Sequence, residues 1–228
     1  MAGIIIPIIE TSSATAGRII CEVNDKVKQL IDCLIKIEED TGENLFFSPI
    51  IFSDDVKTVG LIDEKPVSVQ EFVWRDLKSN GVANFGAALN FLHDKLTVEE
   101  KGGWMKSCGG TAPIIILISN GKPTDDYKSE LEKLKKRGWF KAALKFAVGI
   151  GQEIDKTTLA DFTTSEEAVL DANTGLAWEQ IVEVIKYAMR PTPNFREEPC
   201  SCSDDTAAEP SSSSTDFTLI MDETDDLF

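Results

Sequence analysis

The chain has 228 residues, of which 42% are apolar, and its formal net charge is -16. This length and composition suit one well-buried domain of ordinary size with an additional segment. Because so negative a chain is repelled by phosphate backbones and anionic bilayers, we expect no nucleic-acid partner and no membrane partner, and protein partners are favoured.

The first half of the chain begins with apolar runs that alternate with amphipathic stretches. Residues 4–9 form a continuous apolar run, typical of a strand covered on both faces. Apolar residues at helical spacing then predict a long helix over 17–38. Residues 44–62 predict two strands joined by a turn at 53–55. The elements expected next are a short helix at 69–77, a loop at 79–85 and a helix at 86–96.

The second half continues the same alternation. Its expected strands are 113–119, 144–151 and 167–170, and its expected helices are 125–137, 155–162 and 176–189. Strands that alternate with helices predict a doubly wound α/β fold, with a mostly parallel sheet, one antiparallel edge strand and helices on both faces. In such sheets, ligands bind at the carboxyl ends of the strands.

A change in composition near residue 190 predicts a domain at 1–190 and a tail at 191–228. The tail has ten acidic residues against one basic residue, so it carries -9 of the total charge and leaves -7 for the domain. Its Ser, Pro and acidic composition predicts disorder. Its end has the pattern of a short motif that orders in a partner's groove, although a purely solubilising tail fits equally well. The apolar residues of this motif are Phe217, Leu219, Ile220, Met221, Leu227 and Phe228.

Three segments resemble the motifs of von Willebrand factor A domains, in the same order. They are ETSSA at 10–14, NGVANFGAAL at 80–89 and ILISNGKPTDD at 116–126. The similarity extends over residues 4–189, and among the subgroups the chain is similar to the bacterial TerY-like group of tellurium-resistance and stress loci. This resemblance implies a Rossmann-like fold and a non-enzymatic module that binds proteins.

The resemblance also implies a position for a metal ion. In the family, magnesium is held by a first Asp, two Ser hydroxyls, a Thr hydroxyl and a second Asp; the matching residues here are Glu10, Ser12, Ala14, Ala83 and Asn120. Two alanines supply no ligand and an amide supplies no charge, so we expect a vestigial site and no metal cofactor. The alternative is a receptor for an acidic residue of a protein partner. In it, Glu10, Ser12 and Asn120 would rebuild a weaker Mg²⁺ or Mn²⁺ site with Asp54 or Asp55.

Without a bridging cation, a partner must be bound by direct hydrogen bonds and apolar contacts. We expect Val82 and Phe85 to be the apolar anchors. The resemblance to the TerY-like group implies a scaffold in stress response or defence, whose partners include a protein kinase or a metal-dependent phosphatase. The residues expected at this partner-binding rim are Thr11, Ser12, Ser13, Asp54, Asp55, Val82, Asn84, Phe85, Asn120 and Lys122.

Catalysis has little support in the sequence. The chain contains neither a phosphate-binding G-x-x-x-x-G-K-[ST] loop nor a G-x-S-x-G nucleophile elbow. The single histidine, His93, is expected on a helix as a solvated or capping residue. We therefore expect no enzyme, and a small-molecule enzyme of the doubly wound class is the remaining alternative.

The cysteines and the amino-terminal composition bear on the compartment. Five cysteines without an even spacing are typical of a reducing environment, and Cys200 and Cys202 are expected to be simple thiols. The first seventeen residues carry no Lys or Arg, so we expect neither a secretory signal nor a membrane-spanning helix. We expect a cytoplasmic protein.

Overall fold

The computed structural model describes residues 2–61, 63–107, 110–174 and 176–189. Its strands are β1 (Ala2–Glu10), β2 (Asn44–Phe47), β3 (Ile50–Phe52), β4 (Val56–Thr58), β5 (Val67–Ser68), β6 (Ile114–Ser119), β7 (Leu144–Gly149) and β8 (Val169–Asp171). Its α-helices are α1 (Arg18–Thr41), α2 (Phe85–Lys95), α3 (Tyr127–Leu134), α4 (Gly138–Ala142), α5 (Lys156–Thr163) and α6 (Ala177–Ala188). Its 3₁₀ helices are η1 (Ser13–Thr15), η2 (Glu99–Lys101), η3 (Glu166–Ala168) and η4 (Ala172–Thr174).

The strands form one mixed sheet in the order β4-β3-β1-β6-β7-β8, with β2 also paired to β1 and β5 paired to β2. All pairs are parallel except β3 with β4 and β2 with β5, so β4 is the predicted antiparallel edge strand and β5 adds a second antiparallel pair. On one side of β1, pairing passes from β2 at Ile5 to β3 at Ile8. Pro7, which has no N–H to donate, lies between these positions, and this explains its place in a central strand.

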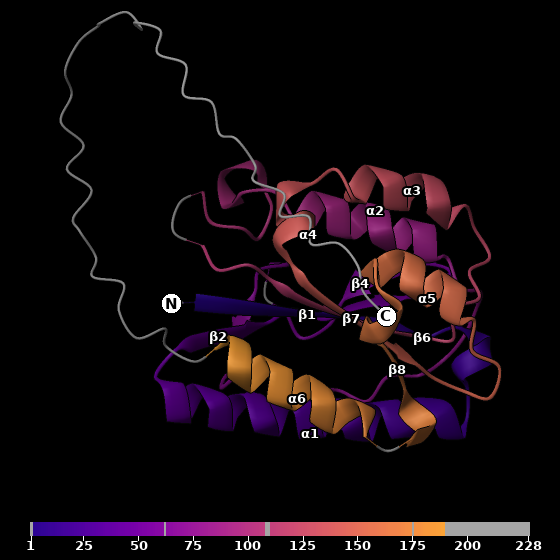
Figure 1. Cartoon of the computed structure of the whole chain (residues 1–228), viewed down its shortest axis with the longest axis horizontal. Coiled ribbons are helices and arrows are strands. Elements are labelled where there is room, and N and C mark those ends of the chain that lie inside the picture. The colour runs from indigo at the N-terminus through magenta and orange to yellow at the C-terminus, as the bar shows by residue number, and fades with distance from the viewer. Residues whose placement is uncertain (1, 62, 108–109, 175, 190–228) are drawn as a thin grey trace, which may run out of the picture. The chain divides into compact units, whose positions relative to one another are not determined.

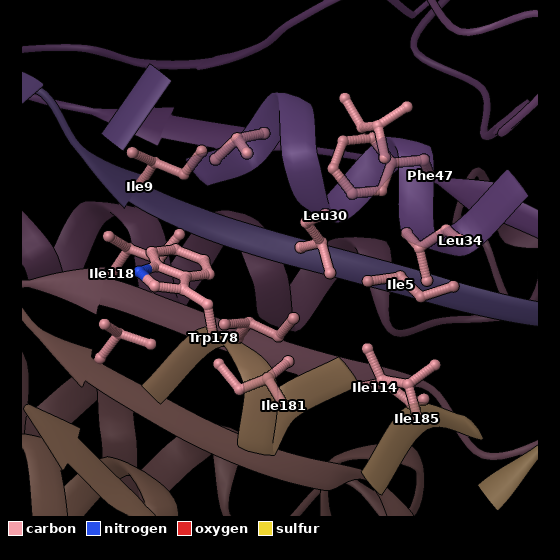
Figure 2. Packing of buried hydrophobic residues seen from close by; sticks show 14 of the residues in the cluster. Ile5, Ile9, Leu30, Leu34, Phe47, Ile114, Ile118, Trp178, Ile181 and Ile185 are labelled. Carbon is pink, nitrogen blue, oxygen red and sulfur yellow. The ribbon is translucent and has the colours of Figure 1, made fainter. Parts of the chain in front are cut away.

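Helices cover both faces of the sheet (Figure 1): α1 and α6 lie on one face, and α2, α3, α4 and α5 on the other. Every residue of β6 is buried, as expected for a strand covered on both sides. Figure 2 shows Leu34 of α1 and Ile185 of α6 packing over Ile5 and Ile114 of the sheet. The predicted doubly wound α/β fold is confirmed.

The helix predicted over 17–38 is confirmed as α1. It begins after Gly17 and runs to Thr41, where Gly42 ends it in the left-handed conformation, with φ of 69°. The helix predicted over 125–137 is α3, which ends at Leu134, and the short helix α4 that follows from Gly138 was not predicted. In the part of the chain that the structure describes, no helix combines the length and the apolar character that a membrane crossing requires.

The prediction of a short helix at 69–77 is wrong. After β5 the chain makes a turn at 69–71, where the Glu71 N–H donates to the Ser68 carbonyl at 3.0 Å, and residues 72–80 have no regular secondary structure. We call residues 69–80 the irregular segment. The side chain of Asn24, which is 5% exposed on α1, accepts a hydrogen bond from the Leu77 N–H (2.8 Å) and donates one to the Leu77 carbonyl (3.1 Å). Phe72 packs edge to face on Phe47 with ring centroids 4.9 Å apart. These contacts tie the irregular segment to α1 and β2.

Replacing Asn24 by alanine should lower the free energy of unfolding by about 2 to 3 kcal/mol, because a buried N–H and a buried carbonyl both lose their partner. Urea unfolding of the full chain, followed by circular dichroism, measures the change. The exposed Asn90 on α2 provides the control, and Asn90→Ala should change stability by less than about 0.5 kcal/mol. Equal effects of the two substitutions would show that the bonds to Leu77 are not what holds the irregular segment.

Candidate functional site

Several loops meet where β1, β3 and β6 end. They are residues 11–16, 53–55, 79–85 and 120–124, which we call the rim. The carboxyl ends of parallel strands are the edge at which sheets of this class bind ligands. The rim contains the residues that the sequence singled out for partner binding, and Glu10 lies directly beneath it at the end of β1.

Glu10 is fully buried, and both oxygens of its carboxylate accept hydrogen bonds from the chain itself. The Ser12 hydroxyl donates to Oε1 at 2.5 Å. The Ser119 hydroxyl and the Asn120 backbone N–H donate to Oε2 at 2.7 and 3.0 Å. The structure therefore brings the predicted residues Glu10, Ser12 and Asn120 together. Asn120 takes part through its backbone N–H and not through its side-chain amide.

Ser119 is a site residue that the sequence reasoning missed. It is 5% exposed, and its hydroxyl accepts from the Gly121 N–H at 2.9 Å while it donates to Glu10. The signal was present in the sequence, because Ser119 ends the otherwise apolar run of β6. A hydroxyl at the end of a buried strand requires a hydrogen-bond partner, and a carboxylate at the end of the neighbouring strand can supply it.

Two residues expected to face a partner lie below the surface. Thr11 is 3% exposed and Ser12 is 2% exposed. The Thr11 hydroxyl donates to the Phe52 carbonyl at 3.1 Å, and the Ser12 hydroxyl bonds to Glu10. The predicted contact of these two side chains with a partner is therefore wrong, because the loop after β1 uses both hydroxyls to bind its own neighbours.

The rim loops are hydrogen-bonded to one another. The Asp54 carboxylate accepts from the Val82 N–H at 2.9 Å, and the Asn84 amide donates to the Asp54 carbonyl at 3.1 Å. The Thr124 hydroxyl donates to the Asn84 side-chain oxygen at 3.1 Å. Within the described residues, no hydrogen bond joins Asp54 or Asp55 to Glu10, so the acids of the hairpin turn and the buried carboxylate belong to separate networks.

The two predicted apolar anchors differ in exposure. Val82 is 48% exposed on the rim, whereas Phe85 is 3% exposed. Phe85 is the first residue of α2, and its ring packs against Phe52 and Tyr127 at centroid distances of 5.6 and 5.8 Å. The prediction of Phe85 as a surface anchor is wrong because the inward face of α2 begins at this residue.

Charged side chains at the rim are partly neutralised. Lys122 donates to Glu153 at 2.6 Å, and this hydrogen bond holds the pKa of the Glu153 carboxyl below its usual value. Asp55 pairs with Lys57 at 3.4 Å. Both pairs are exposed to solvent, where ion pairs contribute little to stability. The exposed residues among those predicted for the rim are Ser13, Asp54, Asp55, Val82 and Lys122.

The amino terminus of α2, which also reaches the rim, is capped by Asp125. Its carboxylate accepts from the N–H groups of Gly86 and Ala87 at 2.8 and 3.0 Å. These bonds satisfy amides that the helix cannot pair internally. These N–H groups could otherwise hold an anion, but here they donate to the carboxylate of Asp125.

Other candidate chemistry lies apart from the rim or outside the described residues. No group of three or more His, Cys, Asp or Glu side chains could hold a metal ion in residues 2–61, 63–107, 110–174 and 176–189. His93 lies on α2, where its Nε2 accepts from the Arg137 guanidinium at 2.8 Å. The tail motif at 217–228 and the pair Cys200 and Cys202 fall outside the described residues.

Comparisons with known proteins are consistent with this geometry. The sequence model of the von Willebrand factor type A domain matches residues 5–184. A comparison with curated proteins gave no match.

Three solved structures are similar in fold. A von Willebrand factor type A protein from Catenulispora acidiphila has a TM-score of 0.60 and 13% identity, over 82% of this chain and 42% of that chain. Proximal thread matrix protein 1 from the mussel byssus, with a zinc-occupied MIDAS motif, has a TM-score of 0.53 and 22% identity, over 81% and 46%. Manganese-loaded TRAP from Plasmodium vivax has a TM-score of 0.57 and 17% identity, over 82% and 73%. The chain thus spans less than half the length of the first two.

Proposed function

Because the chain belongs to the von Willebrand factor type A domain family, we propose that it is a non-enzymatic module that binds a protein partner at the rim without a bound metal ion. Domains of this family often mediate protein–protein interaction and adhesion. The observation that carries the metal-free part of the proposal is the state of Glu10, whose two oxygens already accept three hydrogen bonds from the chain.

The residues present do not fit a divalent cation such as Mg²⁺. This ion requires oxygen ligands in near-octahedral array, and carboxylates supply the charge that holds it. Positions 14 and 83, which would each supply a hydroxyl, are alanines. The Asn120 side-chain oxygen accepts from the Lys122 N–H at 2.8 Å. Glu10 is the single carboxylate of the set, and both of its oxygens accept hydrogen bonds, one from Ser12 and the other from Ser119 and Asn120.

The surface left for a partner is small and mixed in character. Val82 is one of the few large apolar side chains in the described residues that are exposed, and it lies beside the exposed carboxylate of Asp54. Interfaces combine an apolar centre with a polar surround, so Val82 would be the central contact and Asp54 and Ser13 the surrounding ones. The buried carboxylate beneath would support the loops and would not touch the partner.

The finer assignment rests on the resemblance to the TerY-like group. We propose a cytoplasmic scaffold in stress response or defence, whose partner is a protein kinase or a metal-dependent phosphatase. The Ser-rich and Thr-rich tail at 191–228 would then be a substrate of that kinase. Mass spectrometry of the full chain, purified with and without co-expressed partner kinase, would detect phosphate on the tail if this holds.

Titration of Mg²⁺ and Mn²⁺ into the full chain tests the metal-free site. We expect no saturable heat by calorimetry and no rise in melting temperature with either ion, because Glu10 is the single carboxylate and both of its oxygens already accept hydrogen bonds. Manganese-loaded TRAP, as a protein that holds the ion, is a positive control for the assay. Saturable binding that Glu10→Gln abolishes would overturn the proposal and favour a metal-dependent receptor for an acidic residue.

A matched pair of valines tests whether the rim is the binding surface. Val82 is 48% exposed on the rim, and Val73 is 69% exposed on the irregular segment after β5. Binding of a captured partner should survive a chelator, weaken at least roughly tenfold in Val82→Glu, as expected when an interface anchor is lost, and remain unchanged in Val73→Glu. If binding of the partner is lost equally in both variants, or in neither, the interface lies elsewhere.

A further inference from the structure

A cavity of about 490 Å³ lies at the end of the sheet opposite the rim. It opens beside Gly3 and Ile4 at the start of β1, whereas Glu10 and the rim are at the other end of that strand. Its remaining walls come from residues 63–66, β2, the end of α2, the segment from η2 to Lys106, Gly110 with Thr111, and α4. Its volume is within the range of about 300 to 1,000 Å³ in which ligand sites of proteins fall.

Aromatic rings and glycines form the walls of this cavity. Trp139 of α4 and Phe46 of β2 are half-buried at its surface, and Trp104, which is 5% exposed, also lines it. Gly110 faces Trp139 so closely that a Cβ added there would lie 3.1 Å from the ring. Glycines leave backbone uncovered, which lets a flat molecule approach it closely. A space bounded by rings and bare backbone favours a planar occupant.

One edge of the cavity is held in an unusual backbone conformation. Asp63 and Glu64 have φ of 51° and 55°, values that residues other than glycine rarely adopt. Two contacts hold Glu64 there: its carboxylate pairs with Lys95 at 2.7 Å, and its carbonyl accepts from the Trp104 indole N–H at 2.7 Å. The Lys95 ammonium also lies 5.0 Å from the centre of the Phe91 ring. Strain maintained in this way is concentrated at binding sites in proteins.

The cavity is lined by equal numbers of positive and negative side chains. Three lysines and three acids contribute to it, namely Lys65, Lys95, Lys106, Asp63, Glu64 and Glu99. Lys95 and Glu64 already neutralise each other. A charged ligand would gain no net attraction from such a lining, and it would still lose its hydration on entry. The domain's own charge of -7 further disfavours an anion.

We propose that this cavity is a binding site for an uncharged planar aromatic compound, which stacks on Trp139 and is bordered by the strained edge at Asp63 and Glu64. The site is independent of the rim and of any metal ion there. Ring stacking on Trp139 and Phe46 supplies the main contact, because aromatic faces bury large areas in preferred offset geometry. The indole N–H of Trp104 is already bonded to Glu64 and is not a recognition group.

Two fluorescent probes that share one ring system test the site in the full chain. N-phenyl-1-naphthylamine is uncharged, and 1-anilinonaphthalene-8-sulfonate carries an added sulfonate. We expect saturable one-to-one binding of the uncharged probe with quenching of tryptophan fluorescence, and roughly fivefold weaker binding of the sulfonate, because desolvation of its charge is not offset. Absence of saturable binding, or tighter binding of the sulfonate, would overturn the proposal.

Substitutions locate the bound probe. Trp139→Ala should weaken binding of N-phenyl-1-naphthylamine roughly tenfold through loss of the stacking ring. Gly110→Val should weaken it to a similar extent by adding atoms beside Trp139, and it decides the result if Trp139→Ala does not fold by circular dichroism. The rim variant Val82→Glu should bind the probe like the unchanged chain, which separates this test from that of the proposed function. Unchanged affinity in both cavity variants would place the probe elsewhere and overturn the assignment.

Discussion

We expect Glu10→Ala to lower the free energy of unfolding by about 3 to 4 kcal/mol, because two buried hydroxyls and one backbone N–H lose their acceptor and a small cavity replaces the side chain. In a domain of this size the melting temperature should fall by roughly 10 °C. Urea unfolding and thermal unfolding of the full chain, followed by circular dichroism, give the two values. The effect is large because Glu10 is the common acceptor of the loops after β1 and β6.

Glu10→Gln separates the hydrogen bonds from the charge. The glutamine oxygen can accept from Ser119 and Asn120, and its amide can donate to the Ser12 hydroxyl, so the network is kept with a neutral group. We expect a change of no more than about 1 kcal/mol, since burying a neutral amide avoids the desolvation of a carboxylate. If alanine were as well tolerated as glutamine, or stabilised the chain, the hydrogen bonds to Glu10 would not be what holds these loops.

Gly121→Ala is the second substitution with a large expected effect, about 3 kcal/mol or more of unfolding free energy. Gly121 has φ of 78°, and a Cβ there would lie 2.4 Å from the carbonyl oxygen of Asp155. The chain can relieve the overlap only by moving the loop, which would strain the bond from the Asp155 N–H to the Asn120 carbonyl at 2.9 Å. The same movement would disturb the N–H of Gly121 that donates to Ser119.

Gly42→Ala is the matched control for the backbone conformation alone. Gly42 has φ of 69°, and an added Cβ would meet no atom within 4 Å. Its cost should therefore be limited to about 1 kcal/mol, the price of a left-handed residue at a helix end. The difference between the two alanine variants measures the overlap with Asp155. A difference near zero would show that the loop at 120–124 moves freely enough to accept a side chain.

Much of the fold could be predicted from the sequence because its core elements have strong local patterns. The apolar runs that became β1 and β6 have no polar residue until their last position, and α1 has apolar residues at helical spacing. The same reliance on apolar pattern produced the wrong prediction of a helix at 69–77. The segment's apolar residues Val69, Phe72 and Leu77 are buried, but against other elements, and the side chain of Asn24 pairs with the N–H and the carbonyl of Leu77.

The site was predicted less completely than the fold. The resemblance to von Willebrand factor A motifs implied that Glu10, Ser12 and Asn120 lie at one edge of the sheet. It could not indicate that Asn120 takes part through its backbone N–H, or that Ser119 donates to Glu10, because both depend on the register of β6 against β1. The burial of Phe85 likewise depends on the rotation of α2 about its axis, which an eleven-residue helix does not reveal by periodicity alone.

The hydrogen bonds between the rim loops have a consequence for the kinetics of association. Asp54, Val82, Asn84 and Thr124 are bonded across three loops before any partner arrives. The conformational entropy of these loops is therefore lost during folding and not at the moment of encounter. A partner that docks here meets a surface that needs no rearrangement, so the association rate should lie in the range of about 10⁵ to 10⁷ M⁻¹s⁻¹ set by diffusion and orientation. Differences in affinity among rim variants would then arise from the lifetime of the complex.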